Sequence, residues 1–450
     1  MAEPSEKTIV SGPDARAVAL RILRRVREER RRASPLLAAV RRQGIAGREL
    51  RLVTEIVYGT LRWKLALEAA VLRLCRRKPP APEIADVLHL ALYQMLLLTR
   101  VPAHAAVNRA VDQARALGGA PAASFVNAVL RRAGRIGQAL LEPKSTDEAE
   151  RLAFRYAHPV WLVRRWRERW GAPEVEALLA FNQQVPEVSL WPTPDRGDLV
   201  AALRRSGVDP EPAHFVPGAL RARGGSLAFS PLHGDGAFTI QDEASQLVCW
   251  LFERPLRGAV LDLCAGTGGK TAQLAGWSTQ VSLLVASDRN RAALQDLRSR
   301  FRRLRLPLPL LLGADWETGQ SLRARFSTVL LDAPCTGTGV LRRRPEIKLR
   351  LQLCDVHRLA RLQERLLEVA AGMTAPRGQL VYAVCSLEQE EGAHRVDEFL
   401  RRHPEFKRAA AGSCFPRSAG ALLDRCGDLV TLPWRDRIDG FYACRLMRHT

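Results

Sequence analysis

The sequence predicts a multidomain protein, with an all-α N-terminal domain, a small α/β middle domain and a doubly wound, Rossmann-like C-terminal domain. Three observations predict this fold class. Apolar residues repeat at helical spacing over 13–138, the pattern becomes mixed after residue 141, and short apolar strands alternate with helices from residue 237 onward. A chain of 450 residues is also too long for one ordinary core. We therefore expect domains at 1–140, 141–236 and 237–450.

The N-terminal domain is expected to be helical throughout. The helical repeats are DARAVALRILRRVREE (14–29), LRLVTEIVYGTLRWKLALEAAVLRL (50–74), ADVLHLALYQMLLL (85–98) and PAASFVNAVLRRAG (121–134). The breakers KPPAPE and LGGAP separate them. In the middle domain, RYAHPVWLVRRWRERWG (155–171) predicts one basic amphipathic linker helix, and VSLWPTP with DLVAALRRSG predicts a small α/β unit.

The C-terminal domain is predicted from six short apolar strands. These are AVLDLC (259–264), VSLLVAS (281–287), LPLLLGA (308–314), TVLLDA (328–333), QLVYAVC (379–385) and GFYACRL (440–446). Helical stretches lie between the first five, and apolar strands joined by helical crossovers predict a parallel sheet covered on both faces. Ligands of such sheets bind at the carboxyl ends of the strands.

Composition points to a polyanionic partner. The chain has 69 Lys+Arg against 47 Asp+Glu, a formal net charge of +22, which favours nucleic acid over acidic proteins or neutral metabolites. The alternative is a GC-rich genome that raises arginine content everywhere. The N-terminus has no apolar core of signal-peptide length and no run of about 18 apolar residues occurs, so we expect a cytoplasmic protein without a membrane partner.

The cysteines are scattered, without a CxxC pair or metal-type spacing, at positions 75, 249, 264, 335, 354, 385, 414, 426 and 444. We therefore expect no metal site, and in a reducing compartment we expect free thiols. One of them can be a nucleophile, although a free cysteine is more often a small buried apolar residue.

A glycine-rich turn follows the first strand of the C-terminal domain, in LDLCAGTGGKTAQLA. Gly266, Gly268 and Gly269 let backbone N–H groups approach a ligand, and the helix N-terminus adds partial positive charge. A phosphate-binding GxxxxGK[ST] loop would require glycine at Cys264, so an NTPase is disfavoured. A full GxGxxG is absent as well, because its last position is Thr271.

Three acids follow the next strands at the same edge of the sheet. Asp288, Asp315 and Asp332 end the second, third and fourth strands, and an acid about twenty residues past the loop can accept hydrogen bonds from ribose hydroxyls. Each one alone could be a helix cap or turn residue. Together with the glycine loop they predict a nucleoside-containing ligand, and NAD and S-adenosylmethionine both fit.

Two cysteines lie at the ends of adjacent strands. Cys335 follows the fourth strand in LLDAPCTGTG, and Cys385 ends the fifth in LVYAVCS. Neighbouring strand ends are about 5 Å apart, so both thiols can face one pocket. Ser386 and Gln389 have the form of a capping box, which predicts a helix directly after Cys385 whose dipole favours the thiolate.

A thiolate and a methyl donor are needed together for methylation at carbon 5 of a pyrimidine. This carbon is not nucleophilic until a nucleophile adds to carbon 6. A base must then remove the proton on carbon 5 so that the enzyme is released. Asp332 could stabilise the charge that develops on the ring, and a second cysteine could assist release.

At these residues the sequence resembles the Nop/Sun family of RNA cytosine-C5 methyltransferases. The matching motifs occur in order over the catalytic half: IQDEASQL, VLDLCAGTGGKT, LLGAD, LLDAPCTGTGVLRRRPEIK, LVYAVCSLEQEEG and DGFYACRL. The helical half, with YGTLRW, VPAHAAVNRAV and FVNAVLRR, resembles the NusB-like extension of the bacterial 16S rRNA methyltransferases of this family. The resemblance implies a NusB-like RNA-binding domain, a small RRM-like unit and an S-adenosylmethionine-dependent methyltransferase domain.

The resemblance also implies roles for single residues. Cys385 is implied as the nucleophile, Cys335 as the residue that assists release, and Asp332 as part of the reaction centre. The cofactor is implied to lie against Cys264, Ala265, Gly266, Thr267, Gly268, Gly269 and Lys270, with its ribose at Asp288, its adenine at Asp315 and Asp332 also in contact. DNA cytosine methyltransferases attack with the cysteine of the Pro-Cys motif, so the choice of Cys385 rests on the family and not on spacing.

The chain departs from the usual family pattern at four places. The glycine loop reads AGTGGK instead of AAPGGK, Val384 stands where threonine is usual, PCS has become PCT, and VSLWPTP replaces an LRVN-like strand. None of these changes removes a catalytic group, so we expect an active enzyme. We expect it to act as a monomer on 16S rRNA, either free or in an assembling small subunit.

Two alternatives remain open from the sequence. One keeps the same chemistry but acts on tRNA or on another rRNA site. The other is a noncatalytic RNA-binding or antitermination factor that retains a methyltransferase fold. Binding of S-adenosylmethionine would separate the second alternative from an enzyme.

Overall fold

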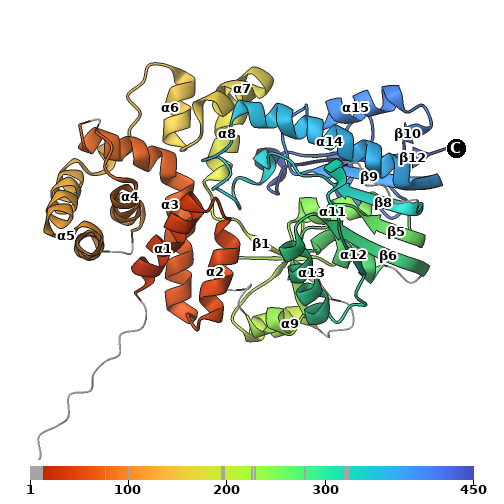
Figure 1. Ribbon diagram of the computed structural model, residues 1–450, viewed down its shortest axis with the longest axis horizontal. Helices are drawn as coiled ribbons and strands as arrows, with labels where there is room; N and C mark the ends of the chain where they lie inside the picture. Colours follow the sequence, from red (N-terminus) through yellow and green to blue (C-terminus); the bar gives the residue numbers. More distant parts are fainter. Residues whose placement is uncertain are drawn as a thin grey trace, which may run out of the picture. The chain divides into compact units, whose positions relative to one another are not determined.

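The computed structural model describes residues 14–76, 78–99, 102–193, 198–223, 227, 230–277, 280–318 and 324–449. The chain forms two compact units, Met1–Gln183 with Arg344–Leu349, and Gln184–Arg343 with Arg350–Thr450 (Figure 1). Residues 1–13, on which the expectation of no signal peptide rests, lie outside the described residues. Within the described part, no helix combines the length and apolar character needed to cross a bilayer.

The first unit is helical, as predicted. Its helices are α1 (Ala15–Glu28), α2 (Ala33–Arg42), α3 (Gly47–Leu74), α4 (Pro82–Leu97), α5 (Ala103–Ile136), the 3-10 helix η1 (Gly137–Leu141), α6 (Glu148–Arg155), α7 (Val160–Trp170) and α8 (Ala172–Asn182). Apolar residues spaced at helical intervals, such as Val53, Ile56 and Val57 of α3, are fully buried.

The breaker LGGAP is confirmed: α5 consists of two helical stretches that meet at a kink, where Gly118 and Gly119 leave the helical conformation and Gly119 has φ +68°. One detail of the helical prediction was wrong, because the segment 155–171 is not one helix. Ala157 takes φ +49° and Pro159 precedes α7, so the chain turns between α6 and α7.

A short segment from the second half of the sequence belongs to the helical unit. Residues 344–349 join it, and their side chains Glu346 and Lys348 are buried there. Lys348 Nζ donates a hydrogen bond to the carbonyl oxygen of Arg62 at 2.8 Å. Burial holds the pKa of Lys348 well below its ordinary value.

The second unit contains a small antiparallel sheet. Its strands are β1 (Val188–Pro192), β2 (Glu211–Pro212), β3 (Leu220–Ala222) and β4 (Phe238–Ile240), in the order β2-β3-β1-β4. Its helices are α9 (Leu199–Arg205) and α10 (Pro231–Gly234). Leu190, Leu203 and Phe238 are fully buried between them, which confirms a small α/β fold for this segment.

The second unit also contains the main sheet, whose strands are β5 (Arg257–Asp262), β6 (Gln280–Asp288), β7 (Leu310–Gly313), β8 (Phe326–Asp332), β9 (Thr374–Val384), β10 (Phe406–Arg408), β11 (Leu429–Thr431) and β12 (Phe441–Arg448). The order is β10-β12-β9-β8-β5-β6-β7, with β11 on β12. The first five predicted strands are parallel neighbours, and β12 pairs antiparallel with β9.

Helices cover both faces of the main sheet (Figure 1). The helices of this part of the chain are α11 (Glu243–Trp250), α12 (Gly269–Gly276), α13 (Arg291–Leu304), η3 (Trp316–Thr318), η4 (Thr338–Val340), α14 (Leu353–Met373), α15 (Ala393–Arg402), η5 (Arg417–Leu422) and α16 (Pro433–Asp436). Leu366 of α14 and Phe399 of α15 pack in one core, and Leu297 of α13 packs in another with Ala286. The doubly wound architecture is therefore confirmed.

Candidate active site

The glycine loop connects β5 to α12 and has the strained conformation that glycine allows. Gly266 and Gly268 have φ values of +53° and +78°. A Cβ atom at Gly268 would lie 2.4 Å from Leu297 Cγ, so glycine is required there for α13 to pack closely. A Cβ at Gly266 would meet no atom within 4 Å, which leaves open space beside the loop.

Two side chains from other elements hold this loop. Asp288, at the end of β6, accepts a hydrogen bond from the backbone N–H of Gly266 at 2.8 Å through Oδ2. Arg300 of α13 donates from Nε to the carbonyl oxygen of Thr267 at 2.9 Å. The predicted Asp288 therefore lies beside the glycine loop, and Arg300 is a supporting residue that sequence reasoning missed.

The second predicted acid lies after the neighbouring strand. Asp315 follows β7 and its Oδ1 accepts a hydrogen bond from the N–H of Glu317 at 3.1 Å. The adjacent Trp316 is buried and donates from Nε1 to Ser287 Oγ at 2.9 Å. Because β6 and β7 are parallel, Asp288 and Asp315 end at the same edge of the sheet.

Lys270 and Asp332 form a close ion pair across this edge. Lys270 Nζ lies 2.7 Å from Asp332 Oδ2 and 5.1 Å from the centre of the Phe441 ring. Burial alone would lower the pKa of Lys270, but the Asp332 carboxylate outweighs it and raises the pKa above its ordinary value. The side chain of Lys270 is 9% exposed and that of Asp332 is 32% exposed, so Asp332 is the member open to a ligand.

Cys335 and Cys385 face one another as predicted. Their Sγ atoms are 3.3 Å apart, and both residues are partly exposed. The hydrogen bond with Cys385 and burial raise the pKa of the Cys335 thiol well above its ordinary value. Cys335 is therefore a neutral thiol at ordinary pH.

The predicted helix directly after Cys385 is absent from this described segment. Helix α15 begins at Ala393, and Ser386 does not form a capping box with Gln389. The Ser386 hydroxyl instead accepts a hydrogen bond from the N–H of Glu388 at 3.1 Å. The prediction that a helix dipole next to Cys385 stabilises its thiolate was thus wrong. The seven residues between Cys385 and α15 form a turn, which is hydrogen-bonded to the loop that contains Cys335.

Buried groups lie beneath the glycine loop. Asp262 is 1% exposed, its Oδ2 accepts a hydrogen bond from Thr271 Oγ1 at 2.6 Å, and burial raises its pKa to about 7. Burial also raises the pKa of the nearby Cys264 thiol well above its ordinary value. Cys264 therefore lines the loop as a neutral thiol, and Asp262 is a buried acid that sequence reasoning did not single out.

A second group of residues that the sequence did not predict fastens the loops around this edge. Arg343 donates from Nε to Asp439 Oδ2 at 2.8 Å and from Nη1 to the carbonyl oxygen of Glu187 at 2.9 Å. Asp242 accepts a hydrogen bond from the N–H of Asp439 at 3.0 Å. These residues lie in motifs that the resemblance had named, but their pairing needs contacts between distant parts of the chain.

Sequence relatives match nearly the whole chain. A Mycobacterium tuberculosis relative, named only as a methyltransferase, is 38% identical over 455 residues, which is 97% of each chain. Ribosomal RNA small subunit methyltransferase B of Pseudomonas syringae is 33% identical over 413 residues, covering 89% of this chain and 90% of its own. The chain belongs to the RsmB/F family of 16S rRNA methyltransferases. It is therefore an rRNA methyltransferase.

The family profiles match three parts of this RsmB/F methyltransferase. The profile described as 16S rRNA methyltransferase RsmB/F matches residues 252–447, the NusB family profile matches 13–135, and the RsmF/B-like ferredoxin-like domain matches 158–225. The NusB-like resemblance of the helical half is thereby confirmed.

Solved structures share the fold. The crystal structure of PH0851 aligns with a TM-score of 0.81 at 24% identity, covering 97% of this chain and 99% of its own. NSun6 from Pyrococcus horikoshii, solved with SFG, aligns with a TM-score of 0.56 at 17% identity, covering 64% of this chain and 97% of its own.

Proposed function

We propose that this RsmB/F methyltransferase transfers a methyl group from S-adenosylmethionine to carbon 5 of one cytosine in 16S rRNA, in the cytoplasm. The proposed route uses a covalent bond between Cys385 Sγ and carbon 6 of the ring. The observation that carries this proposal is the pair of thiols 3.3 Å apart, next to the ion pair of Lys270 and Asp332. A methyl transfer to oxygen or nitrogen would need neither thiol.

The order of bond changes follows from the ring chemistry. The Cys385 thiolate adds to carbon 6, and the electrons of the C5–C6 double bond move to carbon 5, which becomes nucleophilic. After methylation a base takes the C5 proton, the electrons of the C5–H bond form the C5–C6 double bond again, and the electron pair of the C6–S bond leaves with Cys385 as a thiolate. Cys335 lies against the sulfur that must leave, and we assign it to this release step.

A neutral Cys335 thiol fits this division of roles. A thiol that keeps its proton can donate a hydrogen bond to the neighbouring sulfur, and such a bond stabilises that sulfur as a thiolate. Because the hydrogen bond with Cys385 and burial raise the pKa of Cys335, the Cys335 thiol can act as this donor. A donor at Cys335 fits Cys385 as the attacking atom.

The residues at the sheet edge fit a nucleoside cofactor with a methyl donor. The open space at Gly266 gives the ligand room beside the loop from Cys264 to Lys270, and Asp288 and Asp315 end the two strands where ribose and adenine would lie. S-adenosylmethionine supplies the methyl group when it is bound. Asp288 already accepts a hydrogen bond from the loop, so it is held in place before the ligand arrives.

Lys270 and Asp332 are proposed to act together on the cytosine. Asp332 is the more exposed partner, and its carboxylate can accept a hydrogen bond from the exocyclic amine or from a protonated N3. Lys270 neutralises this carboxylate, so that Asp332 does not oppose the thiolate of Cys385. This role differs from the contact with the cofactor that the resemblance implied for Lys270.

The test uses an rRNA fragment and S-adenosylmethionine with a labelled methyl group. We expect 5-methylcytidine after nuclease digestion, detected by mass spectrometry, and we expect Cys385→Ala to abolish it. Cys426→Ala is the matched control, because Cys426 is an exposed free thiol in the same unit. If tRNA is methylated and 16S rRNA is not, the substrate is tRNA. If the protein binds no S-adenosylmethionine, only a noncatalytic RNA-binding role is left.

A further inference from the structure

One buried carboxylate connects the two cysteine-bearing segments. Glu391, in the turn before α15, is fully buried. Its Oε1 accepts hydrogen bonds from the Thr336 N–H and from Gln363 Nε2, both at 2.9 Å. Its Oε2 accepts hydrogen bonds from the hydroxyls of Thr336 and Ser386. All donors that approach this carboxylate therefore come from protein groups in the interior.

The anchored residues are the immediate neighbours of the two thiols. Thr336 follows Cys335, and Ser386 follows Cys385. Gln363 of α14 also donates to the carbonyl oxygen of Pro334 at 2.9 Å, so the Cys335 peptide is held on both sides. The hydroxyls of Thr336 and Ser386 lie 3.0 Å apart, next to the thiol pair in the sequence.

The two cysteines differ in what else holds them. Val384, directly before Cys385, ends a strand that is paired on both sides, with β8 and with β12. Cys335 lies in a turn outside any strand, so side-chain hydrogen bonds supply more of its restraint. Loss of the Glu391 carboxylate should therefore loosen Cys335 more than Cys385.

We propose that Glu391 is a positioning residue that fixes the Cys335 thiol against Cys385 through Thr336 and Ser386, and thereby sets the rate of product release. This inference rests on the proposed covalent route. Glu391 is separate from the residues assigned to the cofactor and the cytosine. Its turn lies within the segment after Cys385, for which a helix had been expected.

The distinguishing measurement is the ratio of trapped protein–RNA adduct to methylated product. In Glu391→Ala, Thr336 and Ser386 lose their common acceptor, and a misplacement of the thiol by about 1 Å can slow a step on the order of 100-fold. We expect methylated product to fall on the order of 10- to 100-fold while denaturant-stable adduct accumulates. Attack by Cys385 continues, because β9 still holds the preceding Val384.

The conservative variant separates position from charge. In Glu391→Gln the amide oxygen can accept from the Thr336 N–H and Gln363, and the amide N–H₂ can donate to the two hydroxyl oxygens after they rotate. We expect this variant to restore release to within about threefold of wild type, because the hydrogen bonds and not the charge hold the turn. Gln389→Ala, at an exposed side chain of the same turn, is the matched control.

A structural role alone predicts a different result. If Glu391→Ala lowers the melting temperature but leaves the ratio of adduct to product at the wild-type value, the positioning role is wrong. Thr336→Val removes one hydroxyl and keeps the side-chain shape, so it provides the same test if Glu391→Ala does not fold. A wild-type protein that forms no adduct and methylates no RNA would contradict the proposed function instead.

Discussion

The sulfur atoms of Cys335 and Cys385 lie 3.3 Å apart, at the ends of two neighbouring parallel strands. Two thiols this close cannot both ionise easily. In the proposed route one thiol attacks while the other keeps its proton, and this leads to a first prediction about the residue that does not attack.

We predict that Cys335→Ala accumulates a protein–RNA adduct. Attack by Cys385 and methyl transfer proceed in this variant, but release slows because the neighbouring thiol is missing. The adduct is measured as a band of reduced mobility in denaturing electrophoresis, and Cys354→Ala, an exposed thiol, serves as control. If the adduct forms in Cys385→Ala and not in Cys335→Ala, then Cys335 is the nucleophile and Cys385 assists release.

We predict that Lys270→Met reduces methyl transfer more than cofactor affinity. The substitution leaves the Asp332 carboxylate without its cation beside the thiols, and an unpaired carboxylate there opposes the Cys385 thiolate. We expect kcat to fall on the order of 100-fold, while the dissociation constant of S-adenosylmethionine changes less than about fivefold. Lys407→Met, an exposed lysine of β10, is the control. If kcat and the affinity for S-adenosylmethionine fall equally, Lys270 acts by binding the cofactor.

We predict that Gly268→Ala weakens cofactor binding. The new Cβ would lie 2.4 Å from Leu297 Cγ, at a backbone φ of +78° that disfavours alanine. The loop or α13 must therefore shift, and we expect a loss of affinity on the order of 10-fold or more, measured by calorimetry. Gly276→Ala is the matched control, because a Cβ there meets no atom within 4 Å. Similar affinities in both variants would show that the loop tolerates the shift.

We predict that Asp262 makes the second unit less stable as the pH rises. The pKa of Asp262 is about 7 in the folded protein, against an ordinary value of 3.8. The folded state therefore keeps a proton that the unfolded chain loses, and the unfolding free energy falls as the pH rises from about 4 to about 7. The full effect is on the order of 4 kcal/mol.

Scanning calorimetry of the wild type and Asp262→Asn measures this effect. The asparagine can still accept the hydrogen bond from Thr271, but it carries no charge at any pH. We expect the two proteins to melt alike near pH 4 and the variant to melt at a higher temperature at pH 8. A constant difference between them across this range would contradict a titrating Asp262.

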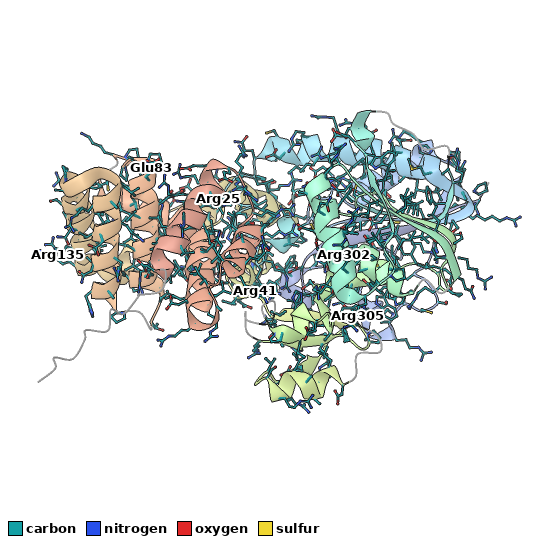
Figure 2. All side chains as sticks on the ribbon, turned by 60° about the horizontal axis from the view of Figure 1, so that its bottom comes forward. Arg25, Arg41, Glu83, Arg135, Arg302 and Arg305 are labelled. Atoms are coloured by element: carbon teal, nitrogen blue, oxygen red, sulfur yellow. The ribbon has the colours of Figure 1, made fainter. Side chains whose placement is uncertain are left out.

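We predict that RNA binding weakens steeply with salt, because contacts with phosphates release counterions. Arg302 and Arg305 are exposed at the end of α13 (Figure 2), and within the described ranges neither pairs with an acid. Replacing both by alanine should flatten the slope of log affinity against log salt by about 2. Arg25→Ala is the control, since Glu29 already pairs with Arg25 at 2.7 Å. A flat salt response in the wild type would contradict an extended phosphate contact.

Local patterns predicted most of the fold and the edge where the site lies. The strands that carry Asp288, Asp332 and Cys385 were placed by their apolar runs, and parallel pairing was enough to bring their ends together. Spacing could not choose between Cys335 and Cys385 as the nucleophile. That choice came from the family resemblance alone.

The sequence failed where a contact joins distant parts of the chain. The ion pair of Lys270 and Asp332 links residues 62 positions apart, and nothing in the glycine loop indicated that its lysine would turn toward β8. The helix expected after Cys385 was wrong for a related reason. Glu391 bonds to a turn 55 residues earlier in the chain, and this tertiary contact overrides the local preference for a helix start.

The way in which residues 344–349 belong to the helical unit has a practical consequence for dissecting this protein. The backbone crosses between the units three times, so a cut at Gln183 does not yield two independent fragments. A truncated chain beginning at Gln184 would keep Glu346 and Lys348 but lose the α3 carbonyl that Lys348 bonds. Expression of residues 184–450 alone should therefore expose the side chains of Glu346 and Lys348 to water. A fragment of residues 1–183 alone would lack the segment 344–349 that packs with it. The two fragments should therefore be expressed together.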